Sequence, residues 1–254
     1  IQVRLYAEDA NKNFQPCAGL LSQVDWAQQD NLRIEHWIEA GVEVSPFFDP
    51  MLAKVIVHAK DRDTALTELK QGLDNSAIYG IEHNQAYLSQ LLSSDLVKKG
   101  QVLTQSLNAF EFKPNTFDVL SGGTQTTIQD YPARTGYWDI GVPPSGPMDC
   151  LSFRLANTLL GNDESCAGLE VIVSGPTLKF NQATSIALTG ASIQASLDGE
   201  PVAMNTQVRV ARGQTLKLGK VLDGARTYLA LQGGIDCPEY LGSRSTFTLG
   251  QFGG

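Results

Sequence analysis

The sequence predicts an α+β protein of two parts, in which a mixed sheet-and-helix domain precedes a mainly-β domain. Strand-like alternation over 32–38 and helical leucine spacing over 66–73 stand close together in the first hundred residues. After residue 117, short apolar runs separated by glycine-rich turns follow one another closely, which is typical of a barrel or sandwich. A single helical pattern, over 150–160, interrupts this second part.

The first domain is predicted to occupy residues 1–113. In chain order we expect a half-exposed strand at 32–38, a loop at 43–50 that holds two prolines, a buried strand at 52–57, a helix capped by Asp63, and a second helix after Asn84. The opening strand-like run carries Arg4 and lacks a Met before it, so we expect that upstream sequence has been removed.

The second domain is predicted to occupy residues 114–254. Asp149 is placed to cap a helix whose apolar stripe is Leu151, Leu155 and Leu159 with Ala156, and Gly161 is placed to end it. Strands are expected at 169–173, 185–188, 193–197, 208–210, 216–218 and 227–231. Asp198-Gly199 predicts a hairpin turn between two strands. Because the chain stops just after an apolar stretch, we expect this β domain to be truncated.

Composition excludes several classes of function. A formal net charge of −8 argues against a broad nucleic-acid surface and against anionic membranes. No apolar run approaches the roughly 20 residues that cross a bilayer. The four cysteines form no CxxC pair and the three histidines have no metal-ligand spacing. We therefore expect free thiols in the cytoplasm and no metal site in this chain.

Six motifs in order over the first 90 residues carry a family resemblance. They are Val3–Asp9, Phe14–Gly19, Glu39–Gly41, Pro46–Val55, Asp61–Ala65 and Gly80–Asn84. Together they resemble the biotin carboxylase C-terminal domain. The resemblance implies that Arg4 contacts the biotin ureido group and that Asp49 lies near that site. A carboxylate beside the guanidinium would orient it, so we expect Asp49 to face Arg4. From the residues alone, an arginine on a strand such as Arg4 is usually only a solvated surface residue.

A second set of motifs follows residue 117. They are Gly123–Asp130, Gly141–Asp149, Asn157–Asn162, Glu170 with Gly175–Leu178, Leu188–Ala191, Gly233–Asp236 and Gly242–Thr246. They resemble the KipA, or allophanate hydrolase subunit 2, family, which implies a cyclophilin-like β-barrel and a carboxyltransferase role. A biotin carboxylase tail followed by a KipA-like domain resembles the order found in the urea carboxylase and urea amidolyase class of ligases.

That resemblance implies a cytoplasmic ligase that carboxylates urea to allophanate with ATP and bicarbonate, by transfer from carboxybiotin. Asp130, Asp149 and Asp236 are candidates to accept the N–H groups of urea. Arg244 is a candidate for a carboxylate or carbonyl oxygen, and Ser145 for a further hydrogen bond. Turn chemistry or helix capping explains each of these five residues equally well. The sequence assigns no general base.

Several functional parts are not recognised in the sequence. Nothing resembles an ATP-grasp portion, so ATP and Mg²⁺ are expected to bind mainly to an upstream domain. There is no Met-Lys-Met biotinylation motif, so covalent biotin is expected on another domain and the fragment alone is expected to be inactive. Three alternatives stay open: guanidine or another small amide as acceptor, a 5-oxoprolinase subunit, and a protein that binds and regulates a kinase. A homo-oligomer of the full-length enzyme also stays open.

Overall fold

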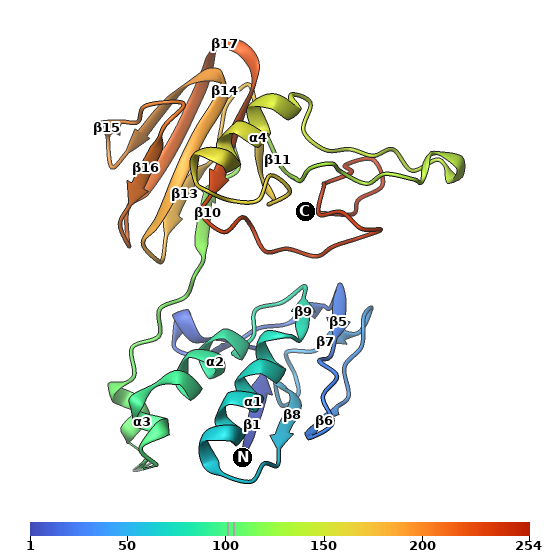
Figure 1. Cartoon of the computed structure of the whole chain (residues 1–254), viewed down its shortest axis with the longest axis vertical. Helices are drawn as coiled ribbons and strands as arrows, with labels where there is room; N and C mark the ends of the chain where they lie inside the picture. The colour runs from blue at the N-terminus through green and yellow to red at the C-terminus, as the bar shows by residue number, and fades with distance from the viewer. Residues whose placement is uncertain (101, 104) are drawn as a thin grey trace. The chain divides into compact units, whose positions relative to one another are not determined.

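The structure, a computed structural model, describes residues 1–100, 102–103 and 105–254. The chain divides into two compact units, Ile1–Pro114 and Asn115–Gly254. Both units are rich in strands and carry few helices, so the predicted α+β class is confirmed (Figure 1). None of the helices in the described ranges is long and apolar enough to cross a membrane.

The first unit is built on a three-stranded antiparallel sheet ordered β1-β8-β6. Helix α1 packs against β8, and α2 packs against α1. Its strands are β1 (Gln2–Tyr6), β2 (Glu8–Asp9), β3 (Gln15–Pro16), β4 (Gly19–Leu20), β5 (Gln23–Asp25), β6 (Leu32–His36), β7 (Glu43–Val44), β8 (Met51–Val57) and β9 (Ala77–Tyr79). Its helices are α1 (Arg62–Asp74), α2 (Gln85–Ser93) and α3 (Asp95–Lys98), with 3-10 turns at Ala10–Lys12 and Ser106–Ala109.

The core of the first unit follows the predicted pattern. Leu66, Leu69 and Leu73 lie on one face of α1 and are buried with Leu52 and Val55 of β8. Burying a leucine of this kind contributes roughly 1.5–3 kcal/mol. The buried strand and both predicted helices are therefore confirmed.

The predicted cap of α1 is wrong by two residues. The side chain of Asp61, not Asp63, accepts a hydrogen bond from the Thr64 backbone N–H at 2.8 Å, and Asp63 lies in the first turn. This bond lowers the pKa of Asp61 below its usual value. An aspartate in the first turn is also favourable there, because the helix N-terminus carries partial positive charge. Two aspartates separated by one residue therefore left the sequence ambiguous.

The second unit is built on an eight-stranded antiparallel sheet that curls into a half barrel (Figure 1). Its strands are β10 (Phe117–Ser121), β11 (Gln125–Gln129), β12 (Gly168–Ile172), β13 (Thr177–Phe180), β14 (Thr184–Leu197), β15 (Glu200–Pro201), β16 (Gln207–Val210) and β17 (Thr215–Leu231). A 3-10 turn lies at Trp138–Ile140, and helix α4 (Cys150–Leu159) packs against β14 and β17.

Two long strands, β14 and β17, hold this sheet together. Each was predicted as two short strands, but each continues through the interval between them because the two strands pair along most of their length. The first half of β17 also pairs with β13, and its second half pairs with β12. The predicted hairpin is confirmed: Asp198 and Gly199, with φ of 51° and 91°, join β14 to β15.

Helix α4 begins after Asp149, as predicted, but only part of the predicted apolar stripe is buried. Phe153, Ala156 and Asn157 are its buried residues, whereas Leu151 is 76% exposed. The polar Asn157 is buried because its side-chain amide donates to the Cys166 carbonyl at 2.9 Å. The buried face therefore includes a hydrogen-bonded asparagine, which apolar periodicity alone does not predict.

Candidate functional site

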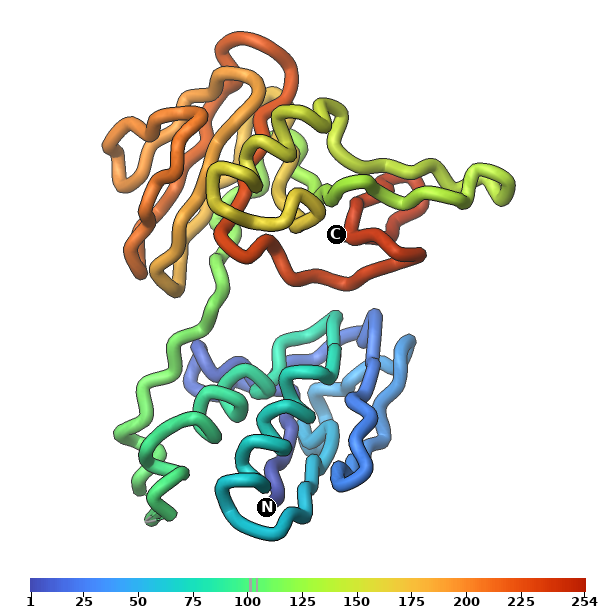
Figure 2. Tube along the Cα trace, in the orientation of Figure 1, coloured from blue at the N-terminus to red at the C-terminus, as the bar shows by residue number. Residues whose placement is uncertain are grey.

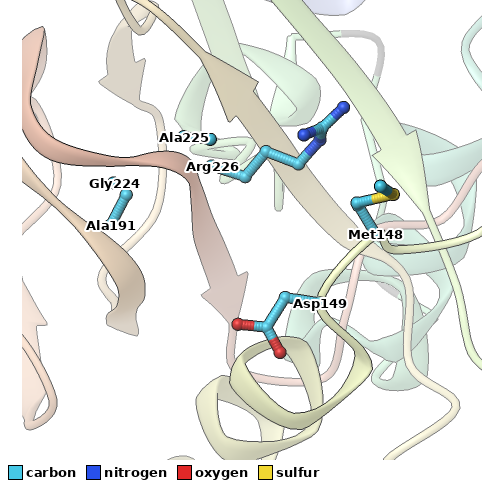
Figure 3. Close-up of a pocket in the computed structure, with 6 residues that line it drawn as sticks. All are labelled: Met148, Asp149, Ala191, Gly224, Ala225 and Arg226. Atoms are coloured by element: carbon cyan, nitrogen blue, oxygen red, sulfur yellow. The ribbon is translucent and has the colours of Figure 1, made fainter.

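A pocket of about 250 Å³ opens on the second unit between the start of α4 and the β14–β17 pair. Its lining residues are Met148, Asp149, Ala191, Gly224, Ala225 and Arg226 (Figure 3). One wall consists of small residues from the two long strands. The two charged side chains of the lining have opposite signs: Arg226 follows the small residues on β17, and Asp149 stands at the start of α4.

An irregularity in strand pairing creates the space. The β14–β17 ladder pairs Gly190 with Thr227 and next pairs Ser192 with Asp223. Three residues of β17, 224–226, therefore lie opposite the single residue Ala191 of β14. Such bulges bend a strand locally and redirect side chains. Here the bulge brings Arg226 to the pocket.

Asp149 is held at the pocket by its role as the helix cap. Its carboxylate accepts hydrogen bonds from the Ser152 backbone N–H, at 3.0 Å, and from the Ser152 hydroxyl. These bonds hold the pKa of Asp149 below its usual value, so the carboxylate is ionised at neutral pH. An ionised carboxylate has about four lone-pair sites, which leaves capacity for further N–H donors.

A buried hydrogen-bond network connects the two charged residues of the pocket. Glu170 on β12 accepts from the Arg226 side-chain Nε at 3.3 Å, from the Tyr228 hydroxyl at 2.8 Å and from the Met148 backbone N–H at 2.9 Å. The Tyr228 hydroxyl in turn accepts from the Asp149 backbone N–H at 2.8 Å. Burial raises the pKa of Tyr228, so its hydroxyl stays a donor at any physiological pH.

The candidate residues Asp130 and Arg244 lie together outside this pocket, in a second network that we call the C-terminal clip (Asp130, Arg134, Ser243, Arg244 and Ser245). The Asp130 carboxylate accepts from the Ser243 and Ser245 hydroxyls, each at 2.6 Å, and from the Arg244 backbone N–H at 2.7 Å. These bonds fasten the segment after β17 to the end of β11, and Figure 2 shows the two segments side by side. The Asp130 carboxylate is thus occupied by the protein itself.

Arg134 completes the clip and is fully buried. Its guanidinium donates to the backbone carbonyls of Tyr240, at 2.9 Å, and Ser245, at 2.9 Å, and lies 4.8 Å from the Phe252 ring centroid. Desolvation lowers its pKa below the usual value. The Arg244 side chain pairs with Glu239 at 3.3 Å.

In the first unit, Arg4 lies on an exposed polar face of the sheet. Arg4, Lys54 and Glu35 occupy neighbouring positions across β1, β8 and β6. Lys54 pairs with Glu35 at 3.9 Å. No described residue forms a hydrogen bond or ion pair with the Arg4 guanidinium. Its donors are therefore available to an outside acceptor.

Asp49 lies in the loop before β8. Its side chain accepts from the Met51 backbone N–H at 2.8 Å. Its charge also adds to the effect of burial in raising the pKa of Glu8 above the usual value. The structure thus places Asp49 beside Glu8, and the expected orienting bond from Asp49 to Arg4 is not among the described contacts.

The last two candidates, Ser145 and Asp236, lie in loops. Ser145 adopts a φ of 57°. The carbonyl of the residue before it, Pro144, accepts a hydrogen bond from the Arg134 backbone N–H. Asp236 follows β17 and is exposed, and it contributes to raising the pKa of the neighbouring buried Cys237 to about 11, an effect that burial dominates. Within the described ranges, no group of three or more His, Cys, Asp or Glu residues could hold a metal ion.

Sequence reasoning missed Arg226 and Tyr228 and quoted Glu170 only as part of a motif. Glu170 is the detectable one, because a single carboxylate in the apolar run Leu169–Val173 is rarely buried without partners. Arg226 and Tyr228 are two apart and therefore share a face of β17. Only the register shows that this face meets Glu170, which pairs with Tyr228.

Two family models match the chain. The model described as biotin carboxylase C-terminal domain covers residues 2–109, and the model described as carboxyltransferase domain, subdomain A and B, covers residues 140–254. The second match includes every residue of the pocket.

The chain is similar to known proteins along its whole length. It is 48% identical over 257 residues to the urea amidolyase of Saccharomyces cerevisiae, covering 100% of this chain and 14% of that protein. It matches the crystal structure of the Kluyveromyces lactis urea carboxylase with a TM-score of 0.90 and 47% identity, covering 99% of this chain and 22% of that one. Over 54% of this chain and 44% of the other protein, it is 39% identical to a 5-oxoprolinase subunit of Haemophilus influenzae.

Proposed function

The chain belongs to the urea carboxylase family, and on that premise we propose that it is part of a cytoplasmic biotin-dependent ligase that carboxylates urea to allophanate with ATP and bicarbonate. The observation that carries the proposal is that one match, at 48% identity, runs through both units. The chain spans 14% of that relative, so the complete reaction belongs to a longer polypeptide. The first unit serves biotin carboxylation and the second serves transfer of the carboxyl group.

The first unit fits a role in binding biotin. The available donors of Arg4 on an exposed sheet face suit a planar acceptor such as the biotin ureido carbonyl. When bound, biotin supplies the nitrogen that carries the carboxyl group. Arg4 would hold the ureido oxygen and fix the orientation of the ring, while Asp49 keeps its loop folded against the start of β8. Covalent biotin, ATP and Mg²⁺ are assigned to domains outside this chain.

The second unit fits a role in binding the acceptor. Urea is a neutral planar molecule whose N–H groups need acceptors, and the ionised Asp149 carboxylate presents acceptors to the pocket. The pocket volume is several times the roughly 30 Å³ that one water occupies, which leaves room for urea and the incoming carboxyl group. Orientation and exclusion of water would be the protein's main contributions. The partners are therefore small molecules, urea and carboxybiotin.

Two other reactions compete with this proposal. Guanidine has the same planar shape as urea and also presents N–H donors, so Asp149 suits both. The likeness to the 5-oxoprolinase subunit of Haemophilus influenzae is confined to 54% of the chain. The biotin carboxylase match over residues 2–109 favours a carboxylase.

The test is acceptor-dependent ATP turnover by the full-length enzyme. We expect bicarbonate-dependent ATP hydrolysis to rise on adding urea, and the rise with guanidine, measured in parallel, decides between the two acceptors. If ATP hydrolysis rises more with guanidine than with urea, guanidine is the acceptor and the reaction class stays the same. ATP turnover that responds to 5-oxoproline and not to bicarbonate would overturn the carboxylase assignment.

A further inference from the structure

The guanidinium of Arg226 reaches the pocket with most of its donors unused. Its Nε donates to Glu170, and no acceptor among the described residues bonds its two terminal nitrogens. The side chain is 31% exposed and lines the pocket, so the guanidinium is accessible to a ligand there. Figure 3 shows the Arg226 guanidinium and the Asp149 carboxylate pointing in different directions.

Glu170 fixes this arrangement from behind. Its side chain is 8% exposed, and its two oxygens take donors from three places: the Arg226 side chain, the Tyr228 hydroxyl and the Met148 backbone. Because Met148 precedes Asp149, one buried carboxylate sets the position of both charged residues of the pocket. A guanidinium held at Nε keeps its terminal fork in one plane.

The two charges define the ligand that fits. Asp149 accepts N–H donors and Arg226 offers two parallel donors, so the best ligand is a small molecule with an amide at one end and a carboxylate at the other. We propose that Arg226 binds the carboxylate formed on the acceptor, and that Glu170 is the positioning residue that orients Arg226. This inference rests on the proposed function, in which an amide gains a carboxyl group.

A purely structural role for Glu170 and Arg226 is the competing explanation. Buried ion pairs often hold strands together without binding a ligand. The terminal nitrogens distinguish the explanations, because a structural pair gains nothing from leaving them open at a pocket. An assay must therefore measure the carboxylate contact separately from folding.

The probes are oxamate, which carries one amide and one carboxylate, and oxamide, which replaces the carboxylate with a second amide. Each is tested as an inhibitor of urea-dependent turnover by the full-length enzyme and, by calorimetry, as a ligand. The variants are Arg226→Lys, Glu170→Gln and their combination. The matched control is Arg209→Lys, which makes the same exchange at an exposed position of β16.

We expect Arg226→Lys to weaken oxamate about tenfold or more, because the ammonium loses the bidentate contact. Oxamide should change less than about twofold, since it presents no carboxylate to the fork. Glu170→Gln should weaken oxamate in the same direction. Glu170 also holds the backbone before Asp149, and a loss on that side affects both probes, so the oxamate-to-oxamide affinity ratio isolates the Arg226 side. In the double variant this ratio should fall no further than in Arg226→Lys alone, because Glu170 orients the fork through Arg226.

Equal losses for oxamate and oxamide in Arg226→Lys, or additive losses of the oxamate-to-oxamide affinity ratio in the double variant, would overturn the inference. So would a response of Arg226→Lys that matches Arg209→Lys. Loss of folding in Glu170→Gln does not obscure the result, because Arg226→Lys alone tests the carboxylate contact. If the wild type shows no response to urea but still binds oxamate through Arg226, the acceptor assignment fails and this inference stands.

Discussion

Removing the Asp130 carboxylate should release the C-terminal clip while leaving the sheet folded. In Asp130→Ala, the Ser243 hydroxyl, the Ser245 hydroxyl and the Arg244 N–H all lose their acceptor. A hydrogen bond to a charged group contributes about 1.5–3 kcal/mol. The two hydroxyls can rotate toward other partners, so we expect a net local cost of about 3–5 kcal/mol rather than the full sum.

Native-state hydrogen exchange, read by mass spectrometry on peptides that cover 240–248, measures this cost directly. A loss of about 3–5 kcal/mol predicts exchange faster by two to three orders of magnitude or more, since each 1.4 kcal/mol is about tenfold. Asp130→Asn should lose less, because the amide oxygen keeps one acceptor. The control is Asp139→Asn at an exposed position in the 138–140 turn, where we expect no change beyond about 0.5 kcal/mol.

The reasoning is refuted if protection over 240–248 is unchanged in Asp130→Ala. It is also refuted if protection falls equally across β14 and β17, because the bonds would then support the whole unit and not the clip.

Three further predictions concern the candidate sites and pH. Arg4→Lys should lower ATP turnover with free biotin by about tenfold or more without changing oxamate binding. The control Arg33→Lys, on the same sheet face, should leave both quantities unchanged. Equal effects of the two variants would remove Arg4 from the biotin site. Asp149→Asn should keep α4 folded, because asparagine caps a helix as well as aspartate does, but it should raise the KM for urea. Asp149→Ala should raise the KM and also lower the stability of the helix by about 1 kcal/mol. An unchanged KM in both variants would show that Asp149 does not bind urea. Burial lowers the pKa of His83 from its usual 6.5, so the stability that the neutral ring contributes is present above about pH 6.5 and is lost as the pH falls. In thermal melts, the melting temperature of His83→Gln should therefore fall less on acidification than that of the wild type. An equal dependence of the melting temperature on pH in both proteins would contradict this.

The His83 prediction has a structural basis. Its Nε2 lies 2.9 Å from the Ile78 carbonyl, and its Nδ1 accepts from the Gln85 backbone N–H at 3.4 Å. Only the neutral ring can accept at Nδ1 while donating at Nε2. Protonation would place the Nδ1–H of His83 against the Gln85 backbone N–H. The charge of Glu82 acts in the opposite direction and favours the protonated ring.

The elements with strong local patterns were predictable from the sequence. Strand β8 and helix α1 are defined by apolar periodicity, and the Asp198–Gly199 turn by its need for positive φ. The continuity of β14 and β17 was not predictable, because it depends on pairing between residues far apart in the chain. The same limit applies to the exposed Leu151, whose spacing fits a buried stripe equally well.

The candidate site was predictable only in part. Asp149 could be placed because a helix cap is a local feature. Asp130 was selected by the same kind of turn motif, but its carboxylate is consumed by the serines of the clip, 113 and 115 positions away. Arg226 carries no local signal at all. Its placement results from a register in which three residues oppose one, and a register cannot be determined from one strand's sequence.

The mismatch between β14 and β17 also has a consequence for how this protein can change. The backbone forms the pairs on both sides of residues 224–226, and within this interval Gly224, with a φ of 92°, is the position that requires glycine. Substituting Ala191 or Ala225 with a larger residue would therefore narrow the cavity without shifting the ladder. Selectivity among small amides can therefore change without loss of the sheet. One or two substitutions at this irregular part of the β14–β17 ladder would be enough to change which amide the pocket prefers.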